Sequence, residues 1–75
     1  DLVNSKITSL PDGLKVGRHL VLVNSKITSL PDGLKVGGDL YLADTPLSQK
    51  YTKQEIRKMI EEKGGEVKGA ILVKE

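Results

Sequence analysis

The sequence predicts an α+β repeat protein: a solenoid of about 2.5 coils with parallel strands, closed by a C-terminal helix and strand. Three observations support this fold class. The segment LVNSKITSLPDGLKVG occurs at residues 2–17 and again, unchanged, at residues 22–37. The leucine pattern then continues through residues 40–47 with the same 20-residue offset. The remaining third loses the repeat and carries the signals of an amphipathic helix. A fixed period of this length is typical of units that stack to share one core.

Each unit begins with a short strand, which the second unit places in the segment HLVLV starting at His19. Apolar residues alternate there with a period of two, so Leu20 and Leu22 are expected on the inner side. His19, Val21 and Val23 are then expected to face outward.

The rest of the unit returns the chain to the start of the next strand. Ile27 and Leu30 are further inner anchors, and residues 31–33, Pro-Asp-Gly, have the composition of a turn. Residues 34–36, Leu-Lys-Val, alternate again and are either a second short strand or an irregular return. Six apolar anchors are therefore expected in each coil; in the second unit they are Leu20, Leu22, Ile27, Leu30, Leu34 and Val36.

The C-terminal third predicts a helix over residues 53–63 and a strand over residues 66–74. Thr52 and Glu55 have the spacing of a capping box, in which two side chains satisfy backbone groups at the start of a helix. The apolar face of this helix holds Ile56, Met59 and Ile60. We interpret the helix and strand as a cap over the last repeat. The alternative is an amphipathic helix that binds a partner.

The stretch HLVLVNSKITSLPDGLKVGGDLYLADTPL resembles a leucine-rich repeat array with the short, 20-residue repeats of the bacterial type. The resemblance rests on the Leu-x-Leu strand, on Ile27 or Leu47 five residues after its second leucine, and on Leu30 followed by proline. It assigns residues 1–48 to the repeats and leaves residues 49–75 as the cap of one structural domain. It implies a parallel strand in each repeat and a binding role for the strand face.

Two departures from the family pattern leave the coil geometry open. Ser25 and Thr45 stand where the family usually has a buried asparagine, and the return segment LPDGLKVGG has no helix signal. A β-solenoid with two or three strands per coil is therefore an alternative to a horseshoe segment.

The composition argues against several classes of protein. The 75 residues include no cysteine and one histidine, so we expect no disulfide framework, no metal site and no cofactor. A net charge of +2 with mixed signs and only two aromatic residues argue against nucleic acid, and no apolar run could span a membrane. The start lacks methionine and a signal peptide, so we expect a processed or shortened chain. The absence of cysteine is compatible with the cytoplasm.

The outward strand face is the candidate surface for a protein partner. It is expected to hold Val3, His19, Val21, Val23, Asp39 and Tyr41. The alternative is that its β-branched residues only favour the strand conformation. We interpret His19 and Asp39 as a cross-strand pair and expect no catalytic residue, because no motif supplies a nucleophile beside them.

We expect no cap before the first repeat, so its edge is the candidate surface for self-association. That edge is expected to hold Leu2, Ile7, Leu10 and Leu14. The sequence thus predicts a non-enzymatic repeat scaffold that binds protein, chiefly a second copy of itself in a two-fold dimer. The alternative is a shortened or engineered repeat protein with no natural partner, which the unchanged duplication favours.

Overall fold

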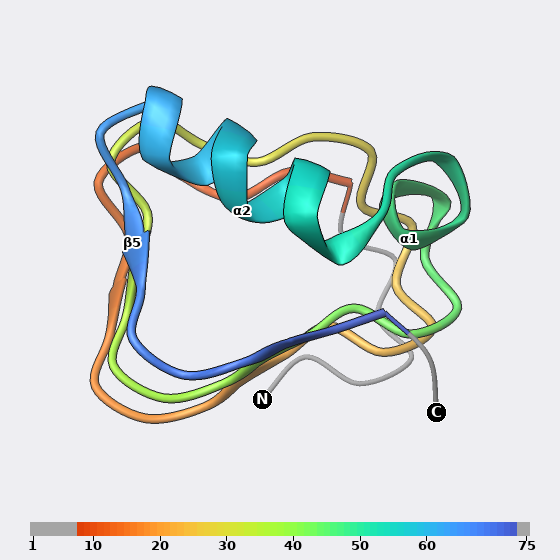
Figure 1. The fold of residues 1–75 in the computed structure, drawn as a ribbon, viewed down its shortest axis with the longest axis horizontal. Helices are drawn as coiled ribbons and strands as arrows, with labels where there is room; N and C mark the ends of the chain where they lie inside the picture. Colours follow the sequence, from red (N-terminus) through yellow and green to blue (C-terminus); the bar gives the residue numbers. More distant parts are fainter. Residues whose placement is uncertain (1–7, 74–75) are drawn as a thin grey trace.

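Six two-residue strands form two parallel sheets in the computed structural model, which describes residues 8–73 (Figure 1). The first sheet contains β1 (Lys15–Val16), β3 (Lys35–Val36) and β5 (Glu66–Val67), in that order. The second sheet contains β2 (Leu20–Val21), β4 (Leu40–Tyr41) and β6 (Ile71–Leu72). The parallel strands that the repeat predicts are therefore present, and the segment at 34–36 does form a strand.

The register of both sheets follows the repeat. Lys15 pairs with Lys35 and Leu20 pairs with Leu40, so equivalent strands of neighbouring units lie side by side, one repeat unit apart in the sequence. Lys35 pairs in turn with Glu66, which lies further along the chain than one repeat unit, because two helices lie between β4 and β5. The single strand expected over residues 66–74 is wrong. The chain bends after β5, so β5 and β6 join different sheets.

The expected C-terminal helix is present as α2 (Lys53–Glu62). Its capping box forms as predicted: the hydroxyl of Thr52 accepts a bond from the Glu55 N–H at 3.2 Å, and the Glu55 carboxylate accepts one from the Thr52 N–H at 2.9 Å. Ile56 and Ile60 are buried against the sheets. In Figure 1, α2 runs along the upper side of the molecule, while β5 marks the first sheet on the left.

A second helix, α1 (Pro46–Lys50), was not expected from the sequence. Thr45 begins it with another capping box: its hydroxyl accepts a bond from the Ser48 N–H at 3.1 Å, and the Ser48 hydroxyl accepts one from the Thr45 N–H at 3.2 Å. Pro46 at the first helical position suits this start, since proline there gives up only an N–H that lacks a partner within the helix. This short helix turns the chain towards α2 and buries Leu47.

The core lies between the two sheets and α2. All six anchors predicted for the second unit are buried, as are Leu40, Leu42, Val67 and Ile71. On the predicted apolar face of α2, Ile56 and Ile60 are buried, whereas Met59 is half-buried. The buried cluster comprises Leu20, Leu22, Ile27, Leu30, Leu34, Val36, Leu40, Leu42, Leu47, Ile56, Ile60, Val67 and Ile71. The Pro-Asp-Gly turns also form as expected, with Gly13 at φ 76° and Gly33 at φ 70°, where a side chain would be strained.

Candidate interaction surfaces

The outward face of the second sheet is shaped by the alternation along β2. Leu20 and Leu22 are buried, whereas Val21 and Val23 are half-buried and His19 is exposed. Val23 lies in the turn after β2, so the regular strand is shorter than the HLVLV segment expected. Val3, the remaining member predicted for this face in the first unit, lies outside the described residues.

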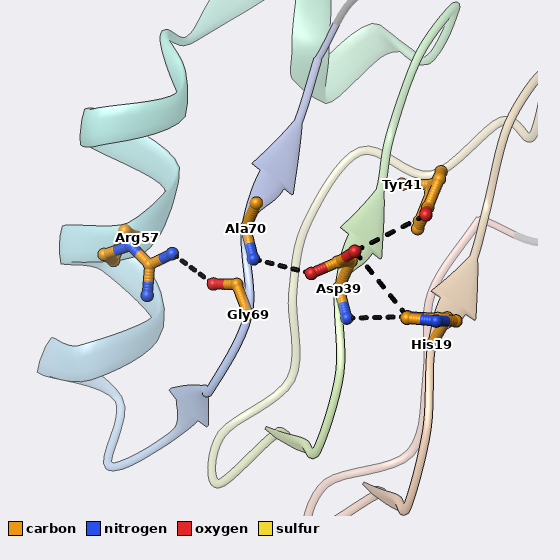
Figure 2. Close-up of polar contacts among 6 residues, drawn as sticks. All are labelled: His19, Asp39, Tyr41, Arg57, Gly69 and Ala70. Atoms are coloured by element: carbon orange, nitrogen blue, oxygen red, sulfur yellow. Dashed lines mark hydrogen bonds and ion pairs between the residues drawn. The ribbon is translucent and has the colours of Figure 1, made fainter.

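A row of polar contacts crosses this sheet where its strands begin (Figure 2). The Asp39 N–H donates to Nδ1 of His19 at 3.0 Å, and the Ala70 N–H donates to Oδ1 of Asp39 at 2.8 Å. The Tyr41 hydroxyl donates to Oδ2 of Asp39 at 3.5 Å. The side chains of His19 and Asp39 thus each satisfy a backbone N–H of the next pass, which fixes the strands side by side.

His19 makes two further contacts on this face. Its Nδ1 lies 3.8 Å from Oδ2 of Asp39. The ring of His19 also meets the ring of Tyr41 edge-on, with centroids 5.8 Å apart. The structure thus gathers His19, Asp39 and Tyr41, with Val21 paired beside Tyr41 across the strands.

The edge predicted for self-association lies at the first repeat unit, beside β1. Leu2 and Ile7 fall outside the described residues, whereas Leu10 and Leu14 are half-buried. Their copies in the second unit, Leu30 and Leu34, are 3% and 0% exposed. Identical residues are thus less covered in the first unit, which leaves an apolar surface at this end of the sheets.

The opposite end of the first sheet is covered by α2. One guanidinium nitrogen of Arg57 donates to the Val67 carbonyl at 2.8 Å, and the other donates to the Gly69 carbonyl at 2.7 Å. Lys63, at the end of the helix, reaches the Leu30 carbonyl at 2.8 Å. The role of Arg57 was not predicted from the sequence, because its two acceptors come together only after β5 has joined the sheet. The available signal was an arginine on the helix face next to Ile56.

Comparisons with known proteins do not assign these surfaces. No protein-family model, curated protein or solved structure matches the chain. Within the part of the chain that the structure describes, the longest helix is α2 with ten residues, and no helix has the length and apolar character needed to cross a membrane. The surfaces are therefore defined by their own burial, charge and hydrogen bonding.

Proposed function

We propose that this chain is a non-catalytic repeat scaffold of the leucine-rich-repeat or β-solenoid type, with about 2.5 stacked coils. We further propose that it associates with a second copy through the end formed by its first repeat. The observation that carries this proposal is the difference in burial between identical residues. Leu10, Leu14 and Val16 are half-buried, whereas their copies in the second unit are at most 3% exposed.

The backbone of β1 supports the same surface. The N–H groups of Lys35 and Gly37 donate to the carbonyls of Leu14 and Val16 at 2.9 and 2.7 Å. Backbone groups alternate in direction along a strand, so those of Lys15 point away from β3. An edge of this kind, beside half-buried apolar side chains, is a template for strand pairing between chains.

The closed end of the first sheet favours a dimer over a fibre. Arg57 occupies the Val67 and Gly69 carbonyls, so a second chain cannot extend the first sheet at β5 without displacing it. Association through the β1 edge, with the same surface on both partners, gives a closed two-fold pair.

Sedimentation at rising protein concentration tests this function. The wild-type chain is expected to reach twice its monomer mass of 8.1 kDa. Leu14→Lys is expected to keep the fold and stay monomeric, because it places a charge in the proposed contact. Ser29→Lys, which puts the same charge on an exposed position of the second unit, serves as the matched control and is expected to dimerise. A wild-type chain that remains monomeric even in concentrated solution would refute the proposal.

The outward face of the second sheet is a second candidate surface, which a different protein would use. It combines the half-buried Val21 and Tyr41 with the exposed imidazole of His19. Aromatic groups with a polar tip are favoured at protein contacts. Val21→Glu is expected to abolish such binding without unfolding the chain. The unchanged duplication of residues 2–17 supports the remaining alternative, an engineered or shortened repeat protein without a natural partner.

A further inference from the structure

Two adjoining hollows lie between β6 and residues 48–61, which run from α1 into α2. Their volumes are about 340 Å³ and 540 Å³. They share Lys53 and Gln54 on the helical side and Ile71 and Leu72 on the strand side. We call this continuous depression the β6 groove. It lies at the last strand of the second sheet, away from the first repeat.

The floor of the β6 groove is formed by Ile71, which is 4% exposed and belongs to β6, the last strand of the second sheet. The N–H groups of Leu40 and Leu42 donate to the carbonyls of Ala70 and Leu72 at 2.9 and 2.7 Å. The backbone groups of residues 70 and 72 therefore face β4. Because the direction of the backbone groups alternates along a strand, the N–H and carbonyl of Ile71 face away from β4. Figure 2 shows the helix that carries Arg57 on this outer side of the strand.

The edges of the two sheets therefore differ at this end of the molecule. At β5 the two forked donors of Arg57 take up the Val67 and Gly69 carbonyls. No equivalent side-chain contact reaches Ile71 from the described residues. The first sheet therefore ends at occupied carbonyls, whereas the second ends at Ile71, whose backbone groups have no side-chain partner among the described residues.

The walls of the β6 groove combine apolar surface with positive charge. Leu72 is 36% exposed, and Val73 is half-buried beside it. Four basic residues and one acidic residue line the two hollows; they are Lys50, Lys53, Arg57, Lys58 and Glu61. This excess of three positive charges exceeds the net charge of +2 for the whole chain. The groove is thus electrostatically matched to an acidic ligand.

We propose that the β6 groove binds an extended, acidic segment of a partner protein as an added strand. The backbone of that segment pairs with Ile71, its apolar side chains pack on Leu72, and its carboxylates meet Lys53 and Lys58. A second copy of this chain fits less well, because its net charge of +2 makes it a poorer match for a basic groove than an acidic segment. The inference uses the opposite end from the proposed dimer contact and does not depend on it.

Fluorescence anisotropy with labelled heptapeptides tests the ligand chemistry. The probe alternates valine with glutamate, and a matched peptide alternates valine with lysine. The acidic peptide is expected to bind at least tenfold more tightly. A third peptide, with the acidic sequence but N-methylated alternate amides, is expected to lose binding because it lacks strand donors. Equal binding of the methylated and unmethylated peptides would overturn strand addition, and absence of binding by the acidic probe would overturn the whole proposal.

Charge reversals locate the contact on the protein. Lys53→Glu and Lys58→Glu are each expected to weaken the acidic peptide about tenfold. Lys26→Glu and Lys35→Glu make the same change outside the β6 groove and are expected to weaken it less than threefold. Equal losses in all four variants would reduce the effect to general charge attraction and contradict the assignment. Loss of self-association in Lys53→Glu, with no peptide binding by the wild type, would assign the groove to a second copy and also overturn the proposal.

Discussion

The unchanged duplication supplies a matched pair of leucines for one decisive substitution experiment. Leu34 and Leu14 occupy the same place in two identical segments, but Leu34 is 0% exposed and Leu14 is half-buried. Truncation of a fully buried leucine to alanine removes its transfer free energy and leaves a cavity, which together cost about 3–5 kcal/mol. At Leu14 solvent fills the space, so we expect only about half of the transfer term, or about 1 kcal/mol.

These losses are large beside the stability of so small a domain. A chain of this length is expected to have a free energy of unfolding of about 4–11 kcal/mol. Leu34→Ala should therefore remove about a quarter or more of the stability, and Leu14→Ala much less. Urea unfolding followed by far-ultraviolet circular dichroism measures both. With a slope of about 1 kcal/mol/M, a difference of about 2 kcal/mol separates the two midpoints by about 2 M.

Equal losses at Leu14 and Leu34 in dilute solution would refute this reasoning, because they would mean that the two copies are equally covered in one chain. Protein concentration separates this outcome from dimerisation. If a second copy covers Leu14, the loss caused by Leu14→Ala grows as the concentration rises, whereas the loss at Leu34 changes little.

The packing of the described residues leads to three more expected outcomes. Gly37→Ala should lower the free energy of unfolding by about 1–3 kcal/mol, because its Cβ would lie 2.5 Å from the Gly17 carbonyl oxygen. Gly17→Ala has open space and should be neutral or stabilising. A lower melting temperature for Gly17→Ala than for Gly37→Ala would contradict this. Arg57→Leu should lower the free energy of unfolding by about 1–3 kcal/mol and increase light scattering, because it exposes the β5 edge. Arg57→Lys should recover part of the stability and part of the lost solubility. Unchanged scattering in Arg57→Leu would argue against the capping role. Thr52→Ala should cost about 1 kcal/mol of unfolding free energy, measured against the exposed control Thr28→Ala, and equal losses would contradict the cap.

The repeat was sufficient to predict the register and the buried side of the strands. An offset of one repeat unit places equivalent positions of the two copies side by side, and alternation with a period of two assigns Leu20 and Leu22 to the interior. Local rules were also sufficient for the start of α2, because Thr52 and Glu55 satisfy each other's backbone groups without help from the rest of the fold. Both predictions depend on contacts that are either local or repeated.

The third pass of the chain could not be predicted in the same way. From Pro46 onward the two helices lengthen the offset beyond one repeat unit, so no periodicity indicates that Val67 pairs beside Val36 or Ile71 beside Leu40. The run Ala-Ile-Leu-Val has the local pattern of one strand, but packing against two sheets bends the chain before it. The contacts of Arg57 and the β6 groove depend on this placement and were therefore also missed.

The different chemistry of the two ends has a consequence for assembly. If two chains pair through their first repeats, both β6 grooves remain at the outer ends of the dimer, because neither takes part in the contact. Such a dimer presents two identical basic grooves, and a partner with two acidic segments would bind both. The second binding event is then intramolecular, so avidity exceeds the affinity of one groove by an amount set by the linker between the segments. Leu14→Lys should abolish this gain and leave the affinity for a single acidic peptide unchanged, which separates the dimer contact from the β6 groove in one measurement.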